Sequence, residues 1–457
     1  MSATGPRWSS RFTFALCSVG AAVGLGSIWR FPYLAGTGGG SAFLFVFVPA
    51  IVLVALPLLV AEFLLGRRGG GNAAKAVGEV AKESGRSPAW NAIGQLGTLA
   101  AFVILSYYTV LASWMLAYMV KCARGDLAGK APAEVGAVWR QFLGSPGELV
   151  LWHLAFLALV VFFSARGVTR GIELANRIRA PALLGLLLVL VAYALATGDT
   201  ARGLAFAFSP NWQAITPEVV LAAIGQAFYA TGVGMAMMIA FGTYVGQDGE
   251  RGPALVRSAL AITVSILVVS LLATLMIFPL VFRFGLDPAQ GPTLVFDVLA
   301  TVFAAMPAGR FFGTLFFLLL VFGALTPSIA GLEPVVGWLV GRGRSRRQAA
   351  ILTGAGTWLL GLLSVASFNL AAGVHPLGFL PVFEGKTFFD VFDYLTSNVM
   401  LQVGALATSI LVGWRLKPSV IEEELAGTRP AVRRVFVLAL RYLCPFAILA
   451  VLAANLL

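Results

Sequence analysis

Charged side chains are scarce in this sequence, and their scarcity excludes a soluble protein. Only 11% of the 457 residues are Asp, Glu, Lys or Arg, whereas 59% are hydrophobic and the mean hydropathy is +0.89. This composition is typical of a helical membrane protein with many spans. The net charge of +12 does not indicate nucleic-acid binding, because the basic residues lie in short loops between apolar segments, where membrane topology explains them.

Cysteine and histidine are also rare, which excludes several kinds of chemistry. Cys17, Cys122 and Cys444 lie in or beside apolar runs without metal-type spacing, so the sequence predicts neither a disulfide framework nor a zinc site. His153 and His375 lie near the ends of apolar segments, with no nucleophile or carboxylate motif beside them. The sequence therefore argues against an enzyme.

Eleven apolar segments are close to the about 20 residues that a membrane-spanning helix needs. They are predicted at 12–36, 42–65, 91–121, 149–165, 178–197, 217–245, 258–282, 311–340, 348–368, 387–414 and 432–456. Most of the 32 Lys and Arg residues fall in alternate loops, which predicts a cytoplasmic N-terminus and a C-terminus outside the cell (inner or plasma) membrane. The first segment is too long for a cleaved signal peptide, so it is predicted to be the first span.

The stretch from Gly20 to Pro32, GAAVGLGSIWRFP, interrupts the first apolar segment. Its glycines, which include Gly24 and Gly26, disfavour a continuous helix, since an interior glycine costs about 1 kcal/mol relative to alanine. A helix broken inside hydrocarbon leaves backbone groups that protein, water or a ligand must satisfy, so the break is a candidate binding site. The alternative is that Gly20 and Gly24 only allow two helices to pack closely.

A second interruption lies at 225–243, in the sixth apolar segment, around Thr231, Gly232 and Gly234. Two interruptions five spans apart indicate a five-span unit used twice, with the second copy inverted in the membrane. This interpretation is borrowed from known transporters built in that way. The predicted fold is an all-α membrane protein with eleven transmembrane helices, a five-plus-five inverted repeat and broken first and sixth helices. The predicted units are repeat one at 12–197, repeat two at 217–414 and an extra helix at 432–456, in one transporter domain over 1–457.

Motifs along nearly the whole chain resemble the neurotransmitter:sodium symporter family of the bacterial type, which includes the bacterial leucine transporter and eleven-span relatives. The matching residues are Trp8, Gly20 to Pro32, Glu62 with Gly66-Arg67, Tyr107-Tyr108, Gly225-Gln226, Thr243-Tyr244, Ala324-Leu325-Thr326 and Asp390 to Asn398. The order of the motifs matches across many segments. The chain is therefore identified as similar to this family.

The resemblance implies a substrate site at the two helix breaks. In the family a tyrosine hydroxyl, here Tyr108, donates to the substrate carboxylate together with backbone N–H groups at the break, where a helix N-terminus stabilises an anion. Gly24 stands where monoamine carriers of the family have an aspartate, which predicts an amino acid rather than a bare amine. The substrate-binding residues implied by the resemblance are Ala22, Gly24, Gly26, Tyr108, Tyr229, Thr231, Met235, Pro327 and Gly331.

The sodium sites of the family are only partly preserved. At the site that touches the substrate, the matching positions are Ala22, Ser27, Ala230 and either Ser265 or Ile266, which offer too few side-chain oxygens, so this site is predicted to be degraded. At the second site four of the family's five oxygens remain, and Pro327 replaces the last hydroxyl. The predicted ligands of a single sodium ion are Gly20, Val23, Gly323 and Thr326.

The residues that match the gates of the family are also only partly preserved. Arg30 and Asp393 resemble the outer gate pair. An arginine within a span must find a carboxylate, a carbonyl or water, since leaving it unpaired costs at least about 2.5 kcal/mol, and Asp393 is the natural partner. On the cytoplasmic side Trp8 and Tyr244 match the inner gate. Two departures accompany them, because the family's N-terminal arginine corresponds to the displaced Arg7 and its aspartate position to Gly341. Inner closure is therefore expected to depend on packing of Trp8 and Tyr244, on water-bridged backbone or on a different ion pair.

Carboxylates within the predicted spans leave open whether sodium ions or protons drive transport. The resemblance gives Glu62 and Gln226 a role in supporting the broken helices, and Glu333 a comparable one. The predicted function is sodium-coupled uptake of an amino acid or a similar solute by alternating access, with one sodium site. The alternatives are proton coupling through Glu62, Glu333 or Asp393, and a weakly coupled sensor or leak protein.

Overall fold

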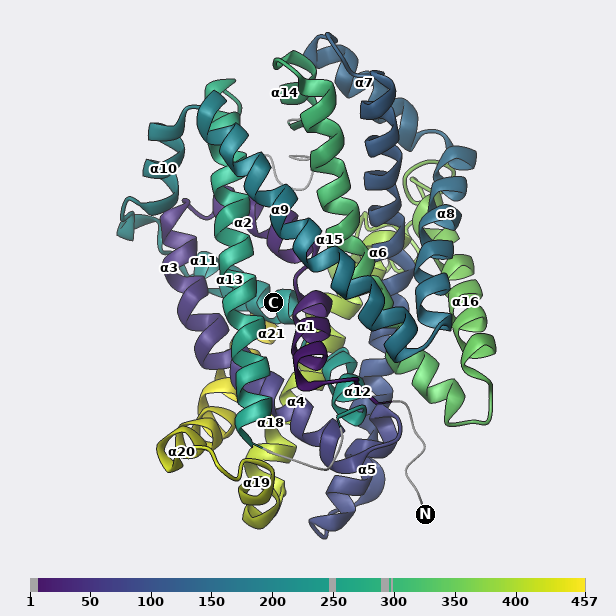
Figure 1. The fold of residues 1–457 in the computed structure, drawn as a ribbon, viewed down its shortest axis with the longest axis vertical. Helices are drawn as coiled ribbons and strands as arrows, with labels where there is room; N and C mark the ends of the chain where they lie inside the picture. The colour runs from purple at the N-terminus through teal and green to yellow at the C-terminus, as the bar shows by residue number, and fades with distance from the viewer. Residues whose placement is uncertain (1–6, 246–251, 289–295, 297–298, 457) are drawn as a thin grey trace.

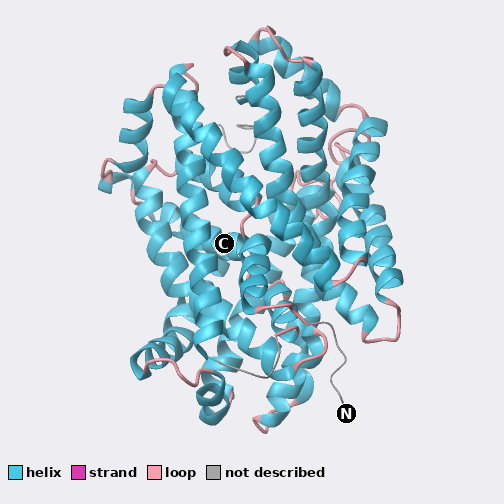
Figure 2. Cartoon of the chain, in the orientation of Figure 1, coloured by secondary structure: helices cyan, strands magenta, loops and turns pink. Residues whose placement is uncertain are grey.

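The computed structural model describes residues 7–245, 252–288, 296 and 299–456. Within these residues the chain forms helices joined by short loops and contains no strand (Figure 2). The helices stand roughly side by side in one bundle (Figure 1). Cys17, Cys122 and Cys444 are all buried and form no disulfide.

The described helices account for the predicted spans. Nine are long and apolar enough to cross a membrane alone, and α1 with its continuation forms a tenth span that is bent by 49°. The helices α11 and α12 supply the interrupted sixth span. In chain order the spans are α1 (Arg11–Ala22) with η1 (Gly26–Arg30) and α2 (Phe31–Thr37); α3 (Ser41–Ala50), η2 (Ile51–Ala55) and α4 (Leu56–Gly69); η3 (Pro88–Asn91) and α6 (Ala92–Arg124); α8 (Pro146–Ala165); η4 (Val168–Glu173) and α9 (Leu174–Thr197); α11 (Pro217–Thr231) and α12 (Met237–Thr243); α13 (Gly252–Arg283); α15 (Gly309–Val340); α16 (Arg346–Ala366); α17 (Phe388–Asp393), η9 (Tyr394–Met400), α18 (Leu401–Ile410) and η10 (Leu411–Arg415); and α20 (Pro430–Leu438), η11 (Ala439–Leu443) and α21 (Cys444–Leu456).

Shorter helices lie in the connections between spans. They are α5 (Ala73–Glu83), α7 (Pro132–Leu143), α10 (Thr200–Phe208), η5 (Trp212–Ala214), α14 (Ala300–Ala305), η8 (Pro381–Phe383) and α19 (Pro418–Glu424). The described start of the chain lies at the same end of the bundle as α5 and α19, and α7 and α14 lie at the opposite end (Figure 1). The prediction of an all-α membrane protein with broken first and sixth helices is confirmed, whereas the exact division into repeats stays a prediction.

The fifth span differs most from the sequence-based prediction. It begins at Val168, ten residues before the predicted start at 178, because η4 and the first turns of α9 continue the helix through charged residues. Among them Glu173 and Arg179 are buried, with exposed fractions of 2% and 3%. The predicted span starts at 178 and leaves Glu173 outside it, but protein contacts hold both charged residues inside the bundle.

The centre of the bundle is formed by α6 and α15. Their apolar windows are 78% and 72% buried, compared with 33% for α8 and 28% for the span that contains α9. The short α1 lies in the middle of the bundle beside α13 and α15, with α12 just below it (Figure 1). Both broken spans therefore lie next to the most buried helices, which can satisfy their backbone groups.

The break in the first span follows α1 directly. Val23 is extended (φ −78°, ψ 99°), and its N–H donates to Val19 O, which ends the helix. A side chain at Gly24 would not fit, because a Cβ atom there would lie 2.6 Å from Pro327 Cγ and 3.0 Å from Gly323 O. Glycine at this position therefore allows the broken backbone to approach α15 closely.

The break in the sixth span uses left-handed backbone conformations. Gly232 (φ 66°) ends α11, and Gly234 (φ 90°) lies so close to α18 that a Cβ atom there would be 2.4 Å from Leu401 O. The fully buried Glu62 on α4 accepts a hydrogen bond from Gly234 N–H at 2.7 Å. Glu62 thus satisfies a backbone donor that the break removes from the helix.

This contact predicts a difference between two substitutions of Glu62. Glu62→Gln retains an oxygen that can accept from Gly234, whereas Glu62→Leu leaves the N–H buried and unpaired, which costs about 1–3 kcal/mol. We expect Glu62→Leu to lower the free energy of unfolding by that amount and Glu62→Gln to remain close to the parent. Unfolding in mixed detergent micelles measures both. Glu79→Gln on the exposed face of α5 is the control, and equal loss in both Glu62 variants would contradict the contact.

Candidate functional site

A small cavity of about 60 Å³ lies between the two helix breaks. Seven of the nine predicted substrate-binding residues line it, namely Ala22, Gly24, Gly26, Tyr108, Tyr229, Met235 and Pro327. The remaining lining is also uncharged and is supplied by α1, α6, α11, α12 and α18. The structure therefore brings most of the predicted site together around one cavity.

One side of the cavity combines a hydroxyl with backbone donors. Tyr108 on α6 places its hydroxyl oxygen 3.4 Å from the point where a Cβ atom on Gly24 would lie. After the break the helix resumes with two hydrogen bonds to the same carbonyl. The N–H groups of Ser27 and Ile28 donate to Gly24 O at 3.1 and 3.2 Å. The N–H groups of the preceding residues stand at a helix start, where such donors have no partner within the helix. This arrangement can receive an anion.

Two predicted substrate-binding residues lie outside the cavity lining. Thr231 directs its hydroxyl back to its own helix, where it donates to Ala227 O at 2.8 Å and Phe228 O at 3.1 Å. Gly331 packs against Leu105. If Gly331 carried a Cβ atom, that atom would lie 3.2 Å from Leu105 Cδ2. Leu105, which does line the cavity, thus separates Gly331 from it.

Gln226 connects the two broken spans. Its Nε2 donates to Gly26 O at 2.7 Å, so α11 holds the first residue of η1. Because Gln226 is 1% exposed, this bond is inaccessible to water. The Gly26 carbonyl also accepts from the backbone N–H of Phe31, so the Gln226 bond is a second one, which joins the two broken spans.

The residues predicted to form the outer gate face a second cavity, of about 290 Å³, on the other side of Tyr229. Arg30 and Asp393 both line it, but among the described residues they make no ion pair within 4 Å. The guanidinium of Arg30 instead stacks over the Tyr229 ring at 4.1 Å from the ring centroid, and Asp393 accepts from Ser397 Oγ at 2.9 Å. Tyr229 thus separates the outer cavity from the smaller one.

The start of the described chain is fastened to the lower half of the sixth span. Trp8 N–H donates to Tyr244 O at 3.2 Å, and Trp8 Nε1 donates to Phe241 O at 3.0 Å. The ring of Trp8 also packs edge-on against Phe241, with centroids 5.1 Å apart. Ser9 adds two hydrogen bonds to the buried carboxylate of Glu173, at 2.7 Å from its N–H and 2.6 Å from its hydroxyl. The two predicted inner gate residues, Trp8 and Tyr244, therefore meet.

An ion pair between a buried carboxylate and a partly exposed arginine lies next to this contact, and the sequence analysis did not identify it. Glu333 on α15 is fully buried and is bound by Arg346 at the start of α16, with nitrogen–oxygen distances of 2.8 and 2.7 Å. Tyr244 also donates its hydroxyl proton to Glu333. The only signals in the sequence were an acid inside an apolar span and an arginine-rich loop after it. Their pairing depends on how α15 and α16 pack.

The predicted ligands of the second sodium site meet where the first span crosses α15. Thr326 Oγ1 donates to Gly20 O at 2.9 Å. Arg179 on α9, which the sequence analysis did not consider, also enters this region, and its Nη1 donates to Val23 O at 3.2 Å. Two of the predicted oxygen ligands, Gly20 O and Val23 O, are therefore already hydrogen-bonded to donors. A sodium ion at this position would have to displace both donors, and the sodium ligand set stays a prediction.

Among the positions that match the first sodium site, Ser27 is the one that contributes a fully buried hydroxyl. Ser27 Oγ is buried and has no hydrogen-bond partner in the described part of the chain. Ala230 contributes no side-chain oxygen, and of the two candidates on α13, Ile266 is apolar and buried while Ser265 is only half-buried. The degradation of this site stays a prediction.

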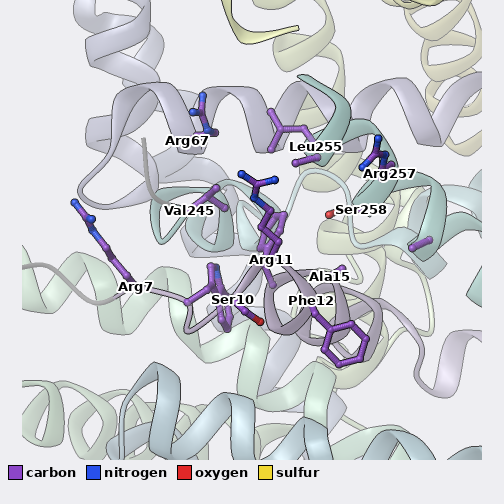
Figure 3. A pocket seen from close by; sticks show the side chains of 14 residues that line it. Arg7, Ser10, Arg11, Phe12, Ala15, Arg67, Val245, Leu255, Arg257 and Ser258 are labelled. Atoms are coloured by element: carbon purple, nitrogen blue, oxygen red, sulfur yellow. The ribbon is translucent and has the colours of Figure 1, made fainter. Parts of the chain in front are cut away.

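A larger cavity, of about 550 Å³, lies at the end of the bundle near the described start of the chain. Figure 3 shows arginine side chains from several elements around it, namely Arg7, Arg11, Arg67 and Arg257. These arginines have interactions of their own, so their charges are not available as free ligands. The cavity is separate from both helix breaks and holds none of the predicted substrate-binding residues.

Comparison with known proteins gives consistent matches over the whole chain. A family model described as "Sodium:neurotransmitter symporter family" matches residues 5–141 and 139–457. The uncharacterized sodium-dependent transporter YhdH of Bacillus subtilis (strain 168) is 36% identical over 97% of this chain and 96% of its own length. An uncharacterized sodium-dependent transporter of Haemophilus influenzae is 32% identical over 98% of each chain. The crystal structure of MhsT in complex with L-phenylalanine matches with a TM-score of 0.88 and 37% identity, over 99% of this chain and 100% of MhsT.

The Glu333–Arg346 pair can be tested by a double-mutant cycle. Arg346→Met leaves the buried Glu333 charge without its partner, and breaking a buried pair in this way costs about 3–5 kcal/mol. We expect the combined Glu333→Leu and Arg346→Met protein to be less destabilised than the sum of the single changes, as measured by unfolding in mixed micelles. Arg347→Met at the neighbouring exposed position is the control. Additive single and double effects would contradict a direct pair.

Proposed function

Because the chain belongs to the Sodium:neurotransmitter symporter family, whose members are secondary transporters and not enzymes, we propose that it takes up a neutral amino acid by alternating access. The observation that carries this proposal is the cavity between the two helix breaks, with the Tyr108 hydroxyl beside Gly24. We place the protein in the cell (inner or plasma) membrane, with a cytoplasmic N-terminus, on the basis of loop charge.

The anchoring group is a carboxylate. A hydroxyl donor and the N–H groups at a helix start favour an anion, and the cavity lining contains no acidic or basic side chain that would compete with it. Gly24 supports an amino acid over a bare amine. An aspartate that could bind an amine does not fit at this position, because even a Cβ atom would lie 2.6 Å from Pro327. The amine of the substrate would then be bound by the backbone carbonyls of the two breaks.

The side chain of the substrate is apolar in this proposal. Large apolar side chains in the cavity lining are Ile104, Leu105, Met235, Met237 and Leu401, which would leave a charged side chain without a partner. Methionine side chains adapt to different apolar shapes, which suits a pocket for more than one neutral amino acid. MhsT, the structural relative, was crystallised with L-phenylalanine, which makes phenylalanine the first substrate to test.

The gates support alternating access. Contacts of Trp8 and Tyr244 fasten the cytoplasmic side, while Tyr229 and Arg30 cover the cavity from the other side. Transport requires the first set to release and the second to close further. In the proposed cycle Asp393 draws Arg30 from the Tyr229 ring into an ion pair, since both side chains face the same outer cavity.

The experiment is uptake of labelled phenylalanine into proteoliposomes under a sodium gradient, a proton gradient and no gradient. We expect uptake that unlabelled neutral amino acids compete for and that phenethylamine, which lacks the carboxylate, does not. The gradient that drives accumulation identifies the coupling ion, and equilibration without accumulation under any gradient would indicate the weakly coupled alternative. Equal competition by phenethylamine, or no uptake of any neutral amino acid, would contradict the proposal.

Tyr108→Phe tests the carboxylate anchor directly. The change removes one hydrogen bond to a charged group, which is worth about 1.5–3 kcal/mol, so the affinity for phenylalanine should fall at least about tenfold. Binding of labelled phenylalanine to the purified protein measures the effect. Tyr107→Phe is the matched control, since Tyr107 does not line the cavity between the helix breaks and its hydroxyl contacts Thr396 at 3.1 Å. An unchanged affinity in Tyr108→Phe would remove Tyr108 from the site.

Arg30 and Asp393 should show coupling in transport. Arg30→Ala leaves Asp393 without its proposed partner and prevents closure of the outer side, so uptake should fall strongly. Replacing both residues with alanine should be less damaging than the sum of the single changes. Initial uptake rates at equal protein levels measure this coupling. Independent, additive effects would show that the two residues never pair during transport.

A further inference from the structure

We propose that Arg179 is a built-in cation that takes the place of sodium between the first and eighth spans. Arg179 lies on α9 in the fifth span and is 3% exposed. Its Nη1 donates to two main-chain carbonyls at once, Val23 O at 3.2 Å and Phe322 O at 3.1 Å. Val23 belongs to the break of the first span and Phe322 to α15, so one positive group bridges the two segments that a sodium ion at this position would join.

The position of the guanidinium coincides with the predicted ion site. Arg179 Nη2 would lie 3.1 Å from a Cβ atom on Gly20, whose carbonyl is another predicted sodium ligand. The Gly20 carbonyl accepts from Thr326 Oγ1, so these two oxygens are paired with each other. Around a metal ion both oxygens would direct lone pairs at the cation. A hydroxyl that donates to this carbonyl directs its proton between the two oxygens, so a shared metal ion would require that proton to turn away.

The electrostatic surroundings of Arg179 resemble those of a bound metal ion. Within the described residues it makes no ion pair with a carboxylate, and its hydrogen-bond acceptors are carbonyl oxygens. A buried cation needs such oxygens, because leaving it unpaired inside a membrane protein is costly. Carbonyl dipoles that would stabilise sodium therefore stabilise the guanidinium. Both bonds come from the same nitrogen, Nη1, whose two hydrogens can serve the two carbonyls at once.

Removal of the guanidinium would leave an oxygen-rich space. Asn176, one turn before Arg179, has a buried Oδ1 without a hydrogen-bond partner among the described residues. This oxygen lies against Gly20, only 1.7 Å from the point where a Cβ atom would be. Together with the carbonyls of Gly20 and Val23 and the hydroxyl of Thr326, Asn176 could complete a set of oxygen ligands. We infer that a neutral side chain at position 179 converts the region into a sodium site.

A tethered cation has a different consequence for transport than a free one. A sodium ion leaves with the substrate and contributes its gradient to each cycle, whereas Arg179 stays with the protein and contributes none. This consequence rests on the proposed function, but the presence of the built-in cation does not. Ion binding to the substrate-free protein therefore tests the inference separately from amino-acid uptake.

The experiment measures the thermal unfolding midpoint of the purified full chain in sodium chloride and in choline chloride at equal ionic strength. The variants are Arg179→Met, Thr326→Val and their combination, with Arg170→Met, an exposed arginine of the same span, as the control. We expect Arg179→Met to gain a saturable rise of the midpoint with sodium that the parent and Arg170→Met lack. Adding Thr326→Val should abolish that gain, while in the parent Thr326→Val should leave the sodium response unchanged.

Two results would overturn the inference. One is a sodium response of the parent that Thr326→Val removes, because it would show that sodium already binds between the first and eighth spans beside Arg179. The other is a folded Arg179→Met protein that gains no response. If Arg179→Met does not fold, the comparison of the parent with Thr326→Val decides alone, since an unchanged response supports the inference and a lost response contradicts it. Failure of phenylalanine uptake would affect the proposed function but none of these outcomes.

Discussion

An interrupted helix inside a bilayer must have its freed backbone groups satisfied by protein, and this requirement organises the centre of the molecule. Glu62 serves the break in the sixth span, and Gln226 and Arg179 serve the break in the first. All three are polar residues in otherwise apolar helices. Each would be expensive to bury without a partner, and each finds one in a backbone carbonyl or N–H at or beside the breaks. The irregular backbone and the buried polar side chains therefore stabilise each other.

The same contacts link the cavity to both gates. Gln226 joins the first break to α11, whereas α12, the other half of the sixth span, carries the contacts that fasten the start of the chain. Tyr244 at the end of α12 reaches the buried Glu333 on α15, and Arg346 binds that carboxylate from α16. A shift of α12 must therefore disturb the Trp8 contact and the Glu333 contact together. The Trp8 contact and the Glu333 ion pair are therefore linked through α12.

The sequence predicted what depends on composition and local pattern. Apolar length located the spans, and glycine at Gly24 and Gly234 located the breaks, because these features are properties of neighbouring residues. What it did not predict are pairings between distant segments. Arg179 bonds to residues 143 and 156 positions away. It lies at the predicted start of the fifth span, where a charged residue is normally a topology signal, so no partner inside the bundle was predicted for it. Arg346 was hidden in an arginine-rich loop for the same reason.

Two departures from the resembled family are each accompanied by a buried charge that the packing reveals. Gly341 stands where the family has an inner-gate acid, and Glu333 with Arg346 supplies an ion pair close to Tyr244. Pro327 stands where the family's second sodium site has a hydroxyl. A proline within a helix also lacks the N–H that would bond to the carbonyl four residues earlier, here Gly323, so this part of α15 carries surplus acceptors. An environment that loses a metal-binding hydroxyl and retains surplus carbonyls still favours a cation, and a guanidinium held by main-chain oxygens meets that demand without an ion from solution.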